Sequence, residues 1–442
     1  MEHSVRSLPA AGVFGLPPSC VVDIFERLTV GERVVACGVS NTWRALLRLP
    51  LLWRTVDLSR SSRERRVNDG LLHALQRVAG DLICNLDVSG RLSPHEEAEQ
   101  YWRANAEEPA QRLTIAAFLA FLAVNARSLG SVRLSSDAYD GSHTTCLRLV
   151  AAYCAAMPQS IFFASVGNCT YDTQGRQALD NAAPFENLVL EGLDVMMGTL
   201  NEDEAPPAEL ALAADLSTHA SLRHLSVTFA RLTSVAVRDT FLDAVIASEL
   251  TSLQLWDCEY GGHFAAVLSR LLVEGRLSSV FVLSNDYDSL FDGPGAALFA
   301  AAVQAPSRLT HLNLHVDLWH NELNAGLVVV EALVDHPSLK LIGLSGFPEP
   351  GDREVVGTAL SRLVSGGPGS ALEELVLQDC FLTDVGLRPL MGALEHSSLK
   401  SLDISSNKST RAFHPVVLQA VRANRSLRSL RANPFDSEFL CV

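Results

Sequence analysis

A six-residue pattern, LxxLxL, returns along most of the chain and constrains its fold more than any other feature. Clear copies begin at residues 222, 250, 309, 372 and 399, and looser copies begin at residues 53, 83, 129, 158, 185, 277, 339 and 427. From residue 129 to residue 427 the copies recur about every 30 residues. This recurrence predicts a repeat architecture in which each unit packs on its neighbours.

Each repeat unit combines the hydrophobic periods of a strand and of a helix. In the unit that begins at residue 250, Leu253 and Leu255 alternate with Gln254 and Trp256, as expected of a strand with one buried side. Apolar residues then recur at helical spacing over 264–272. Since neither element can bury its apolar side alone, the units should stack into an α/β solenoid, a horseshoe with strands along its concave face.

The clearest unit, LEELVLQDCFLTDVGLRPLMGAL at 372–394, resembles the repeats of leucine-rich-repeat proteins, with Cys380 where those repeats take Asn or Cys. The resemblance covers about 85% of the chain. It implies a solenoid over 53–442 with about 12 to 13 strand–helix units. Acidic insertions near 91–112, 200–210 and 284–295 would interrupt it.

A different segment lies ahead of the repeats and contains Trp43 and Trp53, each followed by arginine. Apolar residues at helical spacing predict three short helices there. The segment resembles an F-box, with matches in order at Leu16-Pro17, Ile24-Phe25, Leu28, Val39, Trp43 and Leu52-Trp53-Arg54. Ser19 and Ser40 stand where that family usually has an acidic residue and a cysteine. We place an all-α F-box at 15–52, after a flexible N-terminus over 1–14, and expect Trp53 to join it to the solenoid.

The resemblance implies a receptor that performs no chemistry itself. It implies that the F-box binds a Skp-type adaptor, and through it a cullin, while the repeats hold a protein substrate for an SCF-type ubiquitin ligase. The receptor would then act by raising the effective concentration of its target near the loaded enzyme. By the same resemblance, the adaptor-binding residues would be Leu16, Pro17, Val21, Ile24, Phe25, Leu28, Val39 and Trp43.

An alternative stays open, because repeat solenoids serve many unrelated roles. In that alternative the N-terminal helices only cap the first apolar strand, and the repeats form a protein-interaction scaffold unrelated to ubiquitin transfer.

Composition and charge restrict the function classes. The net charge of −15 argues against a nucleic-acid partner, since neutralising phosphates requires a basic face. The longest apolar run, over 113–124, is shorter than the roughly 20 residues that a membrane-spanning helix needs. The nine cysteines are scattered without CxxC pairs, which favours a reducing compartment. We therefore expect a cytoplasmic or nuclear protein without a membrane segment.

Motifs for catalysis and cofactor binding are missing from the sequence. It contains no GxxxxGK[ST], GxGxxG or HExxH pattern, and no turn selects a nucleophile. His311, Asn313 and His315 share one side of a predicted strand, but a closed metal site needs about four ligands. We expect no enzyme activity, no metal and no cofactor.

Target binding should instead use side chains that point away from the core along the concave face. Exposed aromatic residues there are the informative members, because such residues commonly anchor partners. The expected target-binding residues are Phe162, His224, Gln254, Trp256, Asp257, Phe281, His311, Asn313, His315, Gln378, Asp379 and Asp403.

Overall fold

The structure of the protein is a computed structural model. It describes residues 18–59, 67–88, 92–93, 113–125, 127–137, 154–155, 157–171, 188–197, 208–217, 219–260, 262–284, 291–305, 308–316, 323–346, 352–366 and 370–432. The chain divides into two compact units, Met1–Asp194 and Val195–Val442. The sequence predicts three acidic insertions, and most of their residues lie outside the described ranges.

The first unit begins with short helices and continues with strands and helices. The helices are α1 (Pro18–Glu26), α2 (Val30–Ala36), α3 (Asn41–Leu47), α4 (Pro50–Trp53), α5 (Asp69–Ala79) and α7 (Ile115–Asn125), with the 3-10 turn η3 (Gly80–Leu82). The strands are β1 (Thr55–Asp57), β2 (Asn85–Asp87), β3 (Leu92–Ser93), β4 (Leu113–Thr114), β5 (Ser131–Asp137) and β6 (Ile161–Tyr171). Strand β7 (Leu188–Met197) crosses the boundary between the units.

Strands β1, β2, β5 and β6 pair in that order, and every pair is parallel. Their register aligns Val56, Leu86, Val132 and Phe162 in one row, and all four side chains are buried. This row is the core side of the sheet in the first unit. The neighbouring positions point to the opposite side.

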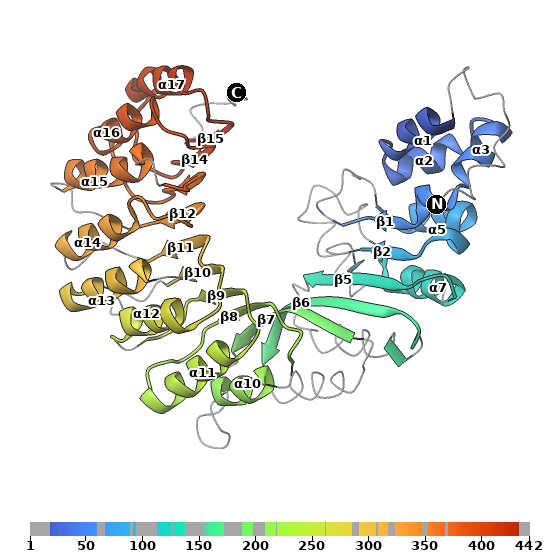
Figure 1. Ribbon diagram of the computed structural model, residues 1–442, viewed down its shortest axis with the longest axis horizontal. Helices are drawn as coiled ribbons and strands as arrows, with labels where there is room; N and C mark the ends of the chain where they lie inside the picture. The colour runs from blue at the N-terminus through green and yellow to red at the C-terminus, as the bar shows by residue number, and fades with distance from the viewer. Residues whose placement is uncertain are drawn as a thin grey trace. The chain divides into compact units, whose positions relative to one another are not determined.

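The second unit alternates strands with helices. Its strands are β8 (His224–Thr228), β9 (Ser252–Trp256), β10 (Ser279–Leu283), β11 (His311–His315), β12 (Leu341–Leu344), β13 (Glu374–Val376), β14 (Ser401–Asp403) and β15 (Ser429–Arg431). Its helices are α10 (Ala208–Leu216), α11 (Val235–Ala247), α12 (Phe264–Glu274), α13 (Gly293–Gln304), α14 (Leu323–Leu333), α15 (Arg353–Ser365), α16 (Asp384–Leu394) and α17 (His414–Ala423), with the 3-10 turn η5 (Arg411–Phe413). Figure 1 shows the helices α11–α17 along one side of the strands.

Strands β8 to β15 pair in sequence order, again all parallel. The second leucine of each clear LxxLxL copy lies in one continuous buried row: Leu225, Leu253, Leu312, Leu375 and Leu402. The alternation along β9 and β10 leaves every second side chain half-exposed. The predicted fold class is confirmed: parallel strand–helix repeats form a leucine-rich-repeat solenoid behind a small helical N-terminus.

Polar side chains in the turns after the strands tie each repeat to the one before it. The thiol of Cys380 donates to the carbonyl oxygen of Leu344, 36 residues earlier. In a later repeat, the amide of Asn407 donates to the carbonyl oxygen of Leu377 at 2.7 Å. Both side chains are buried, so each satisfies a backbone acceptor that water cannot reach. Leucine-rich repeats take Asn or Cys at this position, and the two hydrogen bonds explain why either residue serves there.

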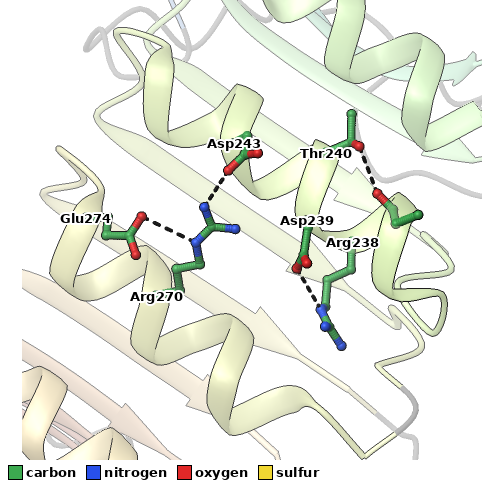
Figure 2. Close-up of polar contacts among 7 residues, drawn as sticks. Arg238, Asp239, Thr240, Asp243, Arg270 and Glu274 are labelled. Atoms are coloured by element: carbon green, nitrogen blue, oxygen red, sulfur yellow. Dashed lines mark hydrogen bonds and ion pairs between the residues drawn. The ribbon is translucent and has the colours of Figure 1, made fainter.

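Ion pairs join neighbouring helices on the outer side of the repeats. Figure 2 shows Arg270 of α12 paired with Asp243 of α11 and with Glu274 of its own helix. Arg276 similarly reaches Glu249 of the preceding repeat at 2.7 Å. Each pair is solvent-exposed, so each adds only a few tenths of a kcal/mol to about 1 kcal/mol. These pairs contribute little stability, but they keep the positive charges of Arg270 and Arg276 on the helix side of the repeats.

Among the described helices, none combines the length and the apolar composition needed to cross a membrane.

Candidate binding surfaces

The helices α1 to α4 are held together by polar contacts as well as by packing. Thr29 begins α2 as part of a capping box with Glu32, and Ser40 caps α3 by accepting from the backbone N–H of Trp43. The guanidinium of Arg33 donates to three carbonyl oxygens, those of Phe25 at 3.0 Å, Glu26 at 2.9 Å and Leu52 at 2.6 Å. Arg33 therefore fastens the end of α1 to α4.

The two tryptophans have different environments. Trp43 is half-buried and packs edge-on against Phe25, with ring centroids 5.5 Å apart. Trp53 is fully buried at the end of α4, and its indole N–H donates to the carbonyl oxygen of Leu47. Strand β1 begins two residues later. Trp53 thus lies at the connection between the helices and the repeats.

Four apolar side chains of this helical segment remain in solvent. Val35 is 73% exposed and Val39 is 61% exposed, while Ile24 and Leu51 are about half-exposed. No packing within the described residues explains these side chains, because α1, α2 and α4 bury other positions, namely Phe25, Val30 and Leu52. An exposed apolar group on a small, internally satisfied domain is typical of a surface that binds a partner.

A second candidate surface lies on the strands of the second unit. We call the strand side chains that alternate with the buried ones the strand face. On this face Trp256 of β9, Phe281 of β10 and His315 of β11 form an aromatic row. The ring centroids of Trp256 and Phe281 are 4.5 Å apart, and those of Phe281 and His315 are 5.4 Å apart. All three side chains are half-buried, so part of each ring is open to solvent.

Two amide side chains flank the middle of the aromatic row. Gln254 and Asn313 lie directly beside Phe281 in the parallel register. Gln254 accepts from the indole N–H of Trp256 at 3.2 Å. Asn313 lies over Gly343, where a Cβ atom would come within 1.6 Å of the Asn313 Oδ1 atom. That Oδ1 atom is buried and has no hydrogen-bond partner among the described residues.

The charges around the aromatic row come from the turns that follow the strands. Asp257 and Asp379 have positive φ angles of 48° and 56°, a conformation that Asp adopts more readily than most residues. Burial lowers the pKa of His315, and Asp379 opposes that shift only in part. Burial therefore favours the neutral form of His315.

One residue expected on the open side of a strand, in β6 of the first unit, lies on the buried side instead. Phe162 is fully buried in register with Val132, so its assignment to target binding is wrong. The next residue, Phe163, has the half-exposed position, and the guanidinium of Arg133 lies over its ring at 5.2 Å. The stretch IFFA is apolar at every position, so alternation could not set the register, and a one-residue shift exchanges the two sides of a strand.

The remaining expected residues divide by exposure. Asp403 occupies a strand-face position but is only 8% exposed, because its Oδ1 atom accepts from Ser405 and its other oxygen lies 3.7 Å from Arg431. The half-buried residues are Gln254, Trp256, Asp257, Phe281, Asn313, His315 and Gln378, and the exposed residues are His224, His311 and Asp379.

Sequence reasoning did not identify Phe229, which follows β8 and is 51% exposed with a φ of 61°. Its backbone N–H donates to the carbonyl oxygen of Trp256, so it lies next to the aromatic row. The LxxLxL pattern ends before residue 229, so the repeat gave no signal for it.

A known family accounts for the N-terminal helices. The family model described as F-box-like matches residues 13–59. These residues form an F-box-like domain. The chain therefore joins an F-box-like domain to leucine-rich repeats, and this prediction is confirmed. A chain that combines these two parts is a scaffold for protein–protein interactions.

Comparison with whole proteins adds little to this assignment. No curated protein matches the chain in sequence. A chain in the crystal structure of the Rad7 and Elc1 complex in yeast is 15% identical, with 93% of this chain and 82% of that chain covered and a TM-score of 0.39. For the crystal structure of the TLR13-ssRNA13 complex the identity is 14%, with 82% and 38% covered and a TM-score of 0.27. TM-scores this low do not establish a shared fold.

The structure places the expected adaptor-binding residues of the F-box-like domain in three groups. Leu16 and Pro17 lie outside the described residues, and Val21 lies in α1. Ile24 and Val39 are exposed. Phe25 is 4% exposed, while Leu28 and Trp43 are half-buried. Val35 and Leu51 are additional exposed apolar residues that the family pattern did not single out.

Catalytic features do not emerge from the geometry. The described residues contain no group of three or more His, Cys, Asp or Glu side chains that could hold a metal ion. Proteins that join an F-box-like domain to repeats are typically non-catalytic.

Proposed function

We propose that this protein is the substrate receptor of an SCF-type ubiquitin ligase. In this proposal the F-box-like domain binds a Skp-type adaptor, and through it a cullin, while the strand face of the repeats binds a target protein. The receptor supplies proximity, and a separate enzyme supplies the chemistry. Such a role would place the protein in the cytoplasm or the nucleus.

The observation that supports adaptor binding is the pair of exposed valines on a domain of this family. A domain that served only as a cap would need its buried side, where Leu52 and Trp53 pack at the start of the repeats. It would not need Val35 and Val39 in solvent at 73% and 61% exposure. The exposed side is thus free for a partner while the buried side caps the solenoid, so the alternative of a cap alone explains less.

Direct binding to a purified Skp-type adaptor tests the proposal. The test variant is the double substitution Val35→Gln and Val39→Gln, since glutamine is polar, is compatible with α2 at position 35, and leaves the turn at position 39 without an apolar side chain. Full burial of a valine contributes about 1.5 kcal/mol or more, so the double variant should weaken the affinity by roughly 10- to 100-fold. Isothermal calorimetry with the full-length chain would measure the change.

The matched control is Val124→Gln in α7, because Val124 is 66% exposed and lies outside the F-box-like domain. It should bind the adaptor like the wild type. If the folded wild type does not bind the adaptor, or if both variants lose the same affinity, the domain is a cap and the scaffold alternative replaces the receptor proposal.

A further inference from the structure

The aromatic row differs from two other half-exposed rings of this protein. Phe163 is covered by Arg133 at 5.2 Å, and Phe381 is covered by Lys408 at 4.4 Å from the ring centroid. Among the described residues, no cation lies over Trp256 or Phe281. Within the described part of the chain, cations thus cover other rings and none covers this row.

The charges near the aromatic row would attract a cation from outside. Strands β9, β10 and β11 contain no arginine or lysine, and the turns carry Asp257 and Asp379. Arginines from the same repeats, such as Arg270, are paired with carboxylates on the helix side, as Figure 2 shows. The exposed carboxylate of Asp379 therefore adds negative charge near a row whose own strands contain no arginine or lysine.

Hydrogen-bonding groups beside the rings are also incompletely used. The indole N–H of Trp256 is satisfied by Gln254, so Trp256 offers a partner its π face rather than a donor. Asn313, on the other side of Phe281, has a buried Oδ1 atom with no partner among the described residues. A buried polar atom left in this way costs stability.

We propose that the aromatic row binds an arginine side chain in an extended, unmodified segment of the target protein. The guanidinium is planar, stacks on aromatic faces and carries five N–H donors with no acceptor, which matches two rings, the amide oxygen of Gln254 and the carboxylate of Asp379. Lysine has a compact ammonium that cannot stack, so it fits less well. The inference rests on the target-binding half of the proposed function and is independent of the adaptor.

Selection from a display library of random peptides of about 12 residues, on the immobilised full-length chain, tests this proposal. The expected result is a consensus that contains arginine. The selected peptide is then resynthesised with citrulline, which removes the charge and keeps the shape, and with lysine. Fluorescence anisotropy should show the citrulline peptide weaker by about 3- to 30-fold, with the lysine peptide between the two.

Protein variants locate the site. Trp256→Leu and Phe281→Leu remove the ring and keep apolar volume, so each should weaken the arginine peptide by about 3- to 30-fold. Asp379→Asn should weaken it and reduce its salt dependence, and asparagine accepts the positive φ of 56° at this position. The matched control is Phe381→Leu, whose ring is already covered by Lys408. The control should bind the peptide like the wild type.

Each alternative outcome overturns the inference. No enriched peptide, or an acidic or wholly apolar consensus, would show that the row does not select a cation. Equal binding of arginine and citrulline peptides, or equal losses in Trp256→Leu and Phe381→Leu, would do the same. Because the assay contains no adaptor, failure of the receptor proposal at the F-box-like domain would leave these results unchanged.

Discussion

Replacing Arg33 should loosen the F-box-like domain while leaving the repeats intact. Arg33→Met keeps the aliphatic stem and removes all three hydrogen bonds, with donor–acceptor distances of 3.0, 2.6 and 2.9 Å. A hydrogen bond from a charged donor contributes about 1.5 to 3 kcal/mol when it is buried. Arg33 is half-exposed, and water can replace it at the freed carbonyl groups, so the expected loss is about 2 to 3 kcal/mol in total.

Hydrogen exchange of the full-length chain, followed by mass spectrometry, measures this loss locally. Since about 1.4 kcal/mol corresponds to tenfold, amides of α1 and α4 should exchange roughly 30- to 150-fold faster in the variant. Amides in β9 to β13 of the second unit should exchange as in the wild type. If the proposed adaptor binds only while Arg33 holds α1 against α4, the variant should also bind the adaptor less tightly.

Arg44→Met is the matched control, because the Arg44 side chain donates to a single carbonyl oxygen, that of Cys37 at 3.1 Å. It should accelerate exchange by only about fivefold, equivalent to roughly 1 kcal/mol. Equal protection of α1 and α4 in Arg33→Met and the wild type would refute the reasoning. A uniform acceleration that includes the repeats would refute its claim of locality.

Three further experiments have defined outcomes. Asn407→Ala leaves buried backbone groups without partners and should destabilise the second unit by about 3 to 4 kcal/mol in urea unfolding, whereas Asn407→Cys should cost less because cysteine serves at an equivalent turn. Gly343→Ala forces the amide of Asn313 away from its place beside Phe281, so it should weaken arginine-peptide binding with little change in the unfolding midpoint. Burial raises the pKa of Cys258 to about 12, so at pH 7.5 iodoacetamide should label exposed Cys20 and leave Cys258 unmodified in a mass-spectrometric assay.

The sequence could identify the repeats because their core positions recur chemically. Leucine, isoleucine and valine return at the same places in the pattern, and each of Leu253, Leu312 and Leu402 is buried as expected. The N-terminal domain was equally recognisable, since its apolar residues follow one another in a fixed order. For the repeats the signal is the spacing of buried residues, whereas for the N-terminal domain it is the resemblance to a known family.

The sequence did not predict which apolar side chains would be exposed. Phe162 and Phe163 are identical in type, and only pairing with Val132 decides which of the two is buried. Val35 and Leu46 are likewise both apolar residues of short helices, yet one is 73% exposed and the other 6%. Such differences follow from neighbours on other elements, which local periodicity does not contain.

The sequence by itself thus determined the repeats, because their apolar positions recur along the chain, and its resemblance to the F-box family identified the domain before them. The tertiary structure decided which side chains are available to partners. It brought Trp256, Phe281 and His315 from three repeats into one row, and it left the exposed valines on the small domain. The physical reason is that a core forms from any regular apolar pattern, whereas a binding surface depends on register between strands that are about 30 residues apart.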